Sequence, residues 1–170
     1  MYIYTKFTKL TRIINMAADK RGIIYDVWDT NNTKSFAITL QKYLTKKGYN
    51  TSITTSLSEE KSCPIIALCL LHSRPEADIN YTLKDLKNEC SRGIILVLLH
   101  FRSNDTRTSL YEGLYKKDYP GVTVHDCFLQ QSFENMKDVN KKIKKDLKER
   151  RGRQQDKHVQ LTAIKRLSGI

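Results

Sequence analysis

Two short runs of the chain are almost wholly apolar, and they restrict the fold more than any other feature. They are CPIIALCLL at residues 63–71 and GIILVLLHF at residues 93–101. Both fall well short of the roughly 18 consecutive apolar residues that a membrane span needs. Their length and continuity are typical of strands that are covered on both faces, as in a parallel sheet with helices on each side. The chain is therefore expected to be an α/β protein that does not span a membrane.

Segments with strand and helix patterns alternate around these two runs. Alternation at this spacing indicates a parallel sheet, and the preference for right-handed crossovers favours the strand order 2-1-3-4-5. We therefore predict a flavodoxin-like three-layer sandwich, with a mostly parallel five-stranded sheet and a basic C-terminal helix. The further strand patterns lie at residues 22–28, 49–55 and 122–129, and apolar residues recur at helical spacing over 36–44, 79–90 and 133–147.

Residues at the ends of the first helical pattern support its boundaries. Asn32 and Thr33 are of the types that commonly cap the start of a helix, and Gly48 is of the type that commonly ends one. We therefore expect a single helix between these positions.

The net charge of +12 is unevenly distributed along the chain. Residues 1–21 carry five Lys or Arg and one acidic residue, and residues 22–134 carry thirteen of each sign. Residues 135–170 carry twelve basic residues against four acidic ones. Because nucleic-acid-binding folds usually concentrate basic residues on the folded surface, a neutral central part does not favour specific nucleic-acid recognition. Basic ends instead attract any polyanion in a salt-dependent way.

These charges also suggest the domain organisation. We predict a flavodoxin-like or TIR-like domain at residues 21–151, between disordered basic segments at residues 1–20 and 152–170. The lysine-rich side of the last helix is the candidate polyanion-binding surface, and a solvated helix face is the alternative interpretation. Its residues are Lys141, Lys142, Lys144, Lys145, Lys148, Arg150 and Arg151.

The four cysteines form no C-x-x-C pair, and no histidine stands at metal-ligand spacing from them. Cys69 and Cys127 lie inside apolar runs, where a thiol behaves as a small apolar side chain. We therefore predict a reducing, cytoplasmic environment, with no metal site and no cofactor. The other two cysteines are Cys63 and Cys90.

Parallel sheets of this kind bind ligands beyond the carboxyl ends of their strands, near the point where the strand order reverses. Arg74 is the most informative residue there, because its guanidinium offers a planar pair of donors to a phosphate or carboxylate. The alternative is structural, since Ser73 and Glu76 have the spacing of a capping box. The residues predicted to bind a nucleotide or another small phosphate ligand are Asn31, Asn32, Ser73, Arg74 and His100.

Other polar residues stand at the strand ends or inside the strand patterns. His72 and His100 close two neighbouring strands and are interpreted either as an acid–base pair or as strand ends that meet solvent. Asp26 and Asp126 lie inside strand patterns, where each is expected to pair with a basic side chain. The chain lacks the glycine-rich nucleotide-binding motifs and the G-x-S-x-G nucleophile motif, so no catalytic residue is assigned.

The stretch Tyr25-Asp26-Val27-Trp28, with the apolar helix pattern that follows it up to Gly48, resembles the opening strand and helix of Toll/interleukin-1 receptor (TIR) domains. The resemblance implies a scaffold for assembly or signalling. In NAD-cleaving members of that family a glutamate stands on the helix after the third strand, and Glu76 is the candidate here. The family's R-D-x-x-P-G-type loop and terminal Phe-Trp box are absent from this sequence.

A second stretch, CPIIALCLLHSRPEADINYTL followed by GIILVLLHF, resembles an uncharacterised multicopy group of small α/β proteins in bony fish. Those proteins carry a similar apolar strand, then S-R-x-x-x-D-I, then a second apolar strand that ends in histidine. The resemblance covers roughly residues 22–150 and implies a flavodoxin-like or TIR-like fold. Asp78 has an alternative role in the favourable field of its helix N-terminus. The residues that carry over as a site are Ser73, Arg74, Asp78 and His100.

The complete α/β pattern, without a catalytic constellation, favours a non-enzymatic protein-interaction or signalling module that binds a protein partner or associates with itself. This expectation rests on fold analogy. One alternative is a nucleotide- or phosphate-binding protein, including a TIR-like NAD hydrolase, with its site at the carboxyl ends of strands 1, 3 and 4. Another is polyanion binding by the lysine-rich helix.

Overall fold

The computed structural model describes residues 20–57, 63–72, 74–100, 119, 121–129 and 136–150, with the backbone alone at residues 90–92. Strands and helices alternate as predicted. The last helix, called here the lysine-rich helix, is described over residues 136–150. The elements before it are β1 (Arg21–Tyr25), α2 (Asn31–Lys46), β2 (Asn50–Thr54), β3 (Ile65–Leu71), α3 (Pro75–Leu83), the 3-10 helix η1 (Lys84–Arg92), β4 (Ile94–His100) and β5 (Thr123–Phe128).

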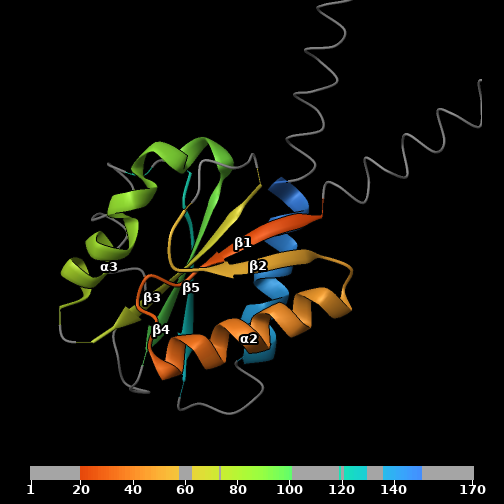
Figure 1. Cartoon of the computed structure of the whole chain (residues 1–170), viewed down its shortest axis with the longest axis horizontal. Helices are drawn as coiled ribbons and strands as arrows, with labels where there is room; N and C mark the ends of the chain where they lie inside the picture. The colour runs from red at the N-terminus through yellow and green to blue at the C-terminus, as the bar shows by residue number, and fades with distance from the viewer. Residues whose placement is uncertain are drawn as a thin grey trace, which may run out of the picture.

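All five strands belong to one parallel sheet in the order β2-β1-β3-β4-β5, which confirms the predicted flavodoxin-like topology (Figure 1). β3 and β4 pair along their whole length, from Ile65 opposite Ile94 to Leu71 opposite His100. Both strands are buried at every position, as expected for the two apolar runs. The carboxyl ends of these strands and of β1 lie at one edge of the sheet, called here the carboxyl edge.

Helices cover both faces of the sheet. Alternate strand residues divide the core into two clusters, so that Ile66 packs with α2 and the lysine-rich helix, whereas Ile65 packs with α3 and η1. This division confirms the three-layer sandwich. It also places α2 and the lysine-rich helix on the same face of the sheet (Figure 1). The lysine-rich helix contributes Val139, Ile143 and Leu147 to the buried core.

Some boundaries differ from the predictions. β1 ends at Tyr25 rather than at Trp28, because the chain turns there and Asp29 adopts a left-handed φ of 51°. Aspartate tolerates this conformation better than most residues. The predicted second helix is regular only to Leu83 and continues as η1. Four of the nine residues of η1, KDLKNECSR, are Asp, Asn, Cys and Ser, which have lower α-helix propensity than the Lys, Leu, Glu and Arg around them.

Several predictions concern residues outside the described ranges. They include the expected disorder of residues 152–170 and of all but the last residue of 1–20, and the proposed roles of Ser73 and Arg151. Across the ranges that are described, no helix combines the length and the apolar character needed to cross a bilayer.

Candidate functional site

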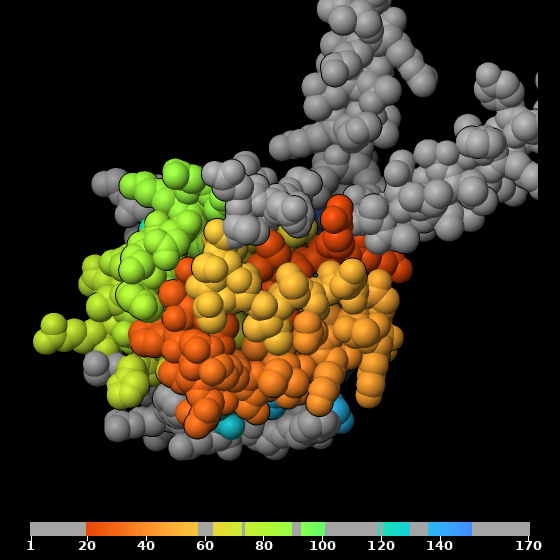
Figure 2. All heavy atoms as spheres, in the orientation of Figure 1, coloured from red at the N-terminus to blue at the C-terminus, as the bar shows by residue number. Residues whose placement is uncertain are grey.

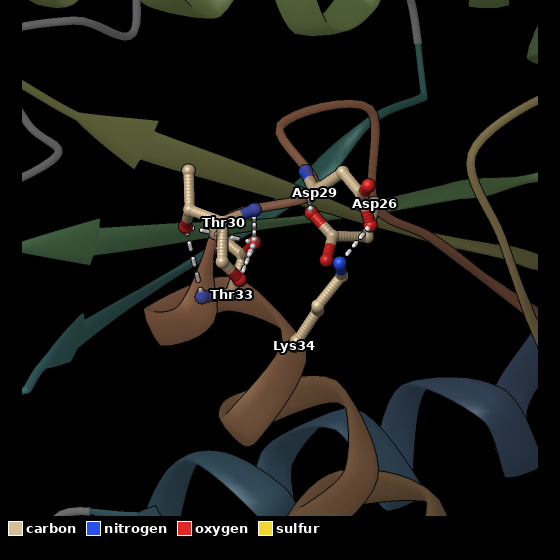
Figure 3. A network of polar contacts seen from close by, with 5 residues as sticks. All are labelled: Asp26, Asp29, Thr30, Thr33 and Lys34. Carbon is tan, nitrogen blue, oxygen red and sulfur yellow. Dashed lines mark hydrogen bonds and ion pairs between the residues drawn. The ribbon is translucent and has the colours of Figure 1, made fainter.

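A polar network holds the turn between β1 and α2 (Figure 3). Thr30 caps the helix: its Oγ1 accepts a hydrogen bond from the backbone N–H of Thr33 at 3.2 Å, and Thr33 Oγ1 accepts one from the backbone N–H of Thr30 at 3.0 Å. The prediction that Asn32 or Thr33 caps this helix is therefore wrong, because the helix begins earlier, at Asn31. Asn31 and Asn32 are exposed in its first turn. The cap already satisfies one of the N–H groups that a bound anion would use.

Asp26 is the only buried acidic residue in the part of the chain that the structure describes, at 1% exposure. Its Oδ1 accepts a hydrogen bond from the backbone N–H of Asp29 at 3.2 Å, whereas its Oδ2 has no hydrogen-bond partner there. Burial raises the pKa of this carboxyl above its usual value of 3.8, and the Thr33 hydroxyl partly opposes the shift. The predicted pairing of Asp26 with a basic side chain is wrong for the described residues, since a backbone N–H takes that place.

An exposed ion pair stands beside this network. Lys34 Nζ lies 3.0 Å from Asp29 Oδ1, and both side chains are about half exposed. A pair of this kind adds little stability, because water screens both charges. Because Lys34 pairs with it, the Asp29 carboxylate opposes the binding of a phosphate at this helix end only weakly.

Asp78 joins the start of α3 to the end of β3. Its Oδ2 accepts a hydrogen bond from the backbone N–H of His72 at 2.9 Å. Arg74 is the N-cap of α3, is exposed, and forms no side-chain capping bond. The predicted capping box is therefore wrong, because Glu76 stands two residues after the N-cap instead of three. Of the predicted ligand-binding residues, Arg74 is the one charged side chain that is exposed at this edge.

Trp28 follows β1 at the carboxyl edge of the sheet and contacts α3. Its indole Nε1 donates a hydrogen bond to Thr82 Oγ1 at 2.9 Å, and its ring meets Tyr81 edge to face with the centroids 5.1 Å apart. Tyr81 is 43% exposed, and Lys84 Nζ lies 4.5 Å from the centroid of its ring. These contacts fix an aromatic side chain at the surface, a feature that sequence analysis did not predict.

His100 ends β4 and is completely buried, although it was predicted to contact a ligand. Its Nε2 lies 2.8 Å from Asp126 Oδ1, and its ring stacks on Phe128 with the centroids 4.5 Å apart. The expected pairing of Asp126 with a basic side chain is thus confirmed. His72 is exposed on the neighbouring strand end. The geometry supports a structural pairing of His100 with Asp126 more than an acid–base pair with His72.

The buried thiols fit the expectation that they are small apolar side chains. Cys69 and Cys127 are buried, and burial raises the pKa of each thiol to about 12. Thiols of such high pKa stay protonated at neutral pH and are poor nucleophiles and metal ligands. Among the described side chains, no cluster of three His, Cys, Asp or Glu is suited to hold a metal ion.

Arg150 clamps the lysine-rich helix to the amino ends of β4 and β5. It is 8% exposed, and its Nη2 lies 2.9 Å from the Ile94 carbonyl oxygen, 3.2 Å from that of Gly121 and 2.6 Å from Thr123 Oγ1. Gly93 leaves room for the guanidinium, because a Cβ there would collide with it. The prediction that Arg150 belongs to the polyanion-binding surface is therefore wrong, because the Arg150 side chain faces the sheet.

The exposed sides of α2 and the lysine-rich helix together form what we call the basic face. α2 carries three lysines and no acidic residue, and the lysine-rich helix carries six lysines against three acidic residues. On the opposite side of the sheet, α3 and η1 carry four acidic residues against three basic ones. All nine lysines are exposed except Lys144, which is half-buried. They are Lys34, Lys42, Lys46, Lys137, Lys141, Lys142, Lys144, Lys145 and Lys148.

This face differs from the expected division of the chain into a neutral central part at residues 22–134 and two basic ends. Val139 and its neighbours make the lysine-rich helix part of the core, and α2 adds its lysines on the same side. In Figure 2 the atoms of α2 (orange) form much of the visible surface, and parts of the lysine-rich helix (blue) emerge beside them. The net charge of zero over residues 22–134 conceals this separation, because four of the acidic residues that the structure describes in this segment lie on α3 and η1, on the other side of the sheet.

No protein-family model matches the chain, and a search of curated proteins finds no match. The resemblances to TIR domains and to the bony-fish group therefore stay predictions. The structure establishes a small α/β protein with a five-stranded parallel sheet.

Proposed function

We propose that the protein is a non-enzymatic interaction module that binds an anionic macromolecule through its basic face. The observation that carries the proposal is the concentration of nine lysines, against three acidic residues, on two adjacent helices of the folded core. A charged surface of one sign raises the local concentration of a partner of opposite charge and steers its approach.

The side chains at the carboxyl edge support an interaction role over a catalytic one. Asp78 is engaged by a backbone N–H, Trp28 by Thr82, and His100 by Asp126. Each of these groups thus connects two elements of the fold. A catalytic acid or base needs to reach a substrate atom, which the burial of His100 opposes.

Elution from immobilised heparin tests the proposal with two matched variants of the full chain. Lys42→Glu/Lys46→Glu reverses two charges on the basic face, and Lys84→Glu/Lys87→Glu reverses two exposed charges on η1. Both variants lower the net charge by the same amount. We expect the α2 variant to elute at lower salt than the η1 variant. Equal elution of the two variants would mean that net charge alone, and not the basic face, attracts polyanions.

A protein partner or self-association is the second candidate, and the fixed aromatic surface at Tyr81 is the observation that favours it. Aromatic side chains held in place before binding contribute strongly to protein interfaces, because little side-chain entropy is lost. Chemical cross-linking in a cell lysate should capture the same protein with the wild type and with Tyr81→Phe, and lose it with Tyr81→Ala. Ile38→Ala, at an exposed position of α2, is the control. Unchanged capture by Tyr81→Ala would remove this surface from consideration.

A small phosphate ligand at the carboxyl edge and a TIR-like NAD hydrolase stay predictions. Arg74 is exposed there, as such a ligand requires, and Glu76 is exposed in the first turn of α3. A thermal-shift measurement with NAD and nucleotides tests the site, since a ligand at about 100 times its Kd adds about 2.7 kcal/mol to the free energy of unfolding. A shift that Arg74→Ala abolishes would support the ligand site.

A further inference from the structure

We infer that the partner of the basic face is the sugar–phosphate backbone of a nucleic-acid double helix, bound without regard to base sequence. This inference rests on the proposed function, because it assigns a chemical class to the anionic macromolecule. The double helix carries one phosphate per about 1.7 Å of its axis, so it presents a denser line of negative charge than most protein surfaces.

Five lysines of the basic face are available to such phosphates. The three acidic residues on the lysine-rich helix already have partners within the protein: Asp138 lies 3.0 Å from Lys141, Asp146 lies 2.6 Å from His125, and Glu149 lies 3.8 Å from Lys145. The acidic groups therefore oppose a bound phosphate only weakly. By contrast, these five lysines make no ion pair with any described residue: Lys42, Lys46, Lys142, Lys144 and Lys148.

The spacing of the lysines suits a repeating anion. Side chains four residues apart in a helix lie on one side and are about 6 Å apart along its axis. Lys42 and Lys46 have this spacing in α2, as do Lys144 and Lys148 in the lysine-rich helix. Both helices follow a strand of the same parallel sheet, so they run in the same general direction across this face. Two rows of positive charge therefore lie along one surface.

The residue types on this face favour a double strand over a single strand. Single-stranded nucleic acid is bound through aromatic rings on which its bases stack. On α2, Phe36 is buried, and Tyr43 is partly buried with Lys47 Nζ 6.0 Å from its centroid. Lysine provides a point charge without the planar fork with which arginine reads guanine. Arg150, the one arginine that the structure describes in the lysine-rich helix, forms hydrogen bonds within the fold.

A membrane surface is a poorer fit to the same charges. Helices that lie on bilayers insert an apolar side among the lipid headgroups. The apolar sides of α2 and the lysine-rich helix are instead packed in the core. Ile38, at 45% exposure, is the one large apolar side chain of the two helices that is exposed among the described residues.

Fluorescence anisotropy of the full chain with labelled duplexes tests this inference. The probes are DNA duplexes of two unrelated sequences, an RNA duplex, and a single strand of the same length, each titrated between 50 and 200 mM salt. We expect the two DNA sequences to bind equally and more tightly than the single strand. The logarithm of the binding constant should fall linearly with the logarithm of the salt concentration, by about 0.9 for each phosphate neutralised.

The variants used with heparin locate the contact. Lys42→Glu/Lys46→Glu should reduce the salt slope by about one unit per lysine and weaken binding to every duplex, because each phosphate contact contributes about that amount. Lys142→Gln/Lys148→Gln makes the same test on the second helix with less perturbation of folding, which circular dichroism checks. The η1 variant Lys84→Glu/Lys87→Glu should retain the wild-type slope.

Each of the following outcomes would overturn the inference. The first is equal weakening by the α2 and η1 variants, and the second is tighter binding of the single strand. The third is binding to vesicles of anionic phospholipid that depends on these lysines, with no binding to duplexes. If heparin retention depends on the basic face but duplex binding is absent, the proposed function stands and only the nucleic-acid assignment fails. If heparin retention is also independent of the face, both fail.

Discussion

At the scale of single residues, the carboxyl group of Asp26 carries the clearest consequence of burial. Its side chain is 1% exposed, and Oδ2 has no hydrogen-bond partner among the described residues. Desolvation of the charged form raises its pKa above 3.8, so the folded protein holds this proton more tightly than the unfolded chain does. The contribution of Asp26 to the free energy of unfolding is therefore largest below pH 3.8, and it is lost as the pH rises through the folded-state pKa.

We predict that Asp26→Asn removes this pH dependence. Urea unfolding of the wild type and the variant between pH 4 and 7 should show the wild type losing stability relative to the variant as the pH increases. Asp29→Asn is the matched control, because Asp29 is exposed and asparagine also tolerates its left-handed φ. A stability difference between wild type and Asp26→Asn that stays constant with pH would contradict the raised pKa.

Residue roles were the least predictable part of the molecule. The alternating pattern placed Asp26 inside a strand, but did not show that its partner is a backbone N–H formed by the turn at Asp29. Arg150 looked like one more basic residue on a solvated helix. Its buried position follows from the approach of the helix to Gly93 and β5, which depends on tertiary packing.

At the scale of elements, the start of α2 depends on the pair Thr30 and Thr33. We predict that Thr30→Ala lowers the free energy of unfolding by about 1 kcal/mol, because a helix N–H loses its side-chain acceptor. Asn32→Ala is the control and should have almost no effect, since Asn32 is exposed and is not the cap. Urea unfolding measures both variants. If Asn32→Ala lowered the free energy of unfolding more than Thr30→Ala, Asn32 would be the cap, as the sequence predicted.

The attachment of the lysine-rich helix to β4 gives a second prediction at this scale. Gly93→Ala should lower the free energy of unfolding by about 1 to 2 kcal/mol, because alanine is strained at the left-handed φ of 80° that Gly93 adopts. Arg150→Ala should lower the free energy of unfolding by about 2 to 3 kcal/mol, because buried hydrogen bonds from a charged group are lost. In the single variant Gly93→Ala the collision between the new Cβ and the guanidinium adds to the loss from backbone strain. We therefore expect the double variant to lower the free energy of unfolding by less than the sum of the two measured single-variant losses, since the collision then disappears. Additive costs would show that Gly93 and Arg150 act independently.

The elements themselves were largely predictable. Continuous apolar runs identified β3 and β4, and apolar residues at helical spacing identified α2 and the lysine-rich helix. These patterns are strong because burial on two faces or on one helical stripe leaves little choice of residue. Caps and boundaries were less predictable, since Thr30 and Asn32 are both good cap residues and the turn conformation decides between them.

At the scale of the whole molecule, the arrangement of charge matters more than its sum. The sequence divides into basic ends and a neutral centre. In the described part of the fold, α2 and the lysine-rich helix instead form a basic face, whereas α3 and η1, on the opposite side of the sheet, carry nearly balanced charge. No single segment reveals this separation. It appears only when the exposed side of α2 and that of the lysine-rich helix are brought together on one face of the sheet. The sequence favoured a protein partner, whereas the packing of the two helices favours an anionic macromolecule.

The central claim is that the folded domain binds polyanions through the basic face, and lysine footprinting tests it most directly. The full chain is acetylated with and without heparin, and mass spectrometry measures the modification rate of each lysine. We predict that heparin slows modification of Lys42, Lys46, Lys142 and Lys148, while the exposed Lys84 and Lys87 of η1 react at an unchanged rate. Protection of the η1 lysines to the same extent, or no protection of Lys42 and Lys46, would contradict the claim.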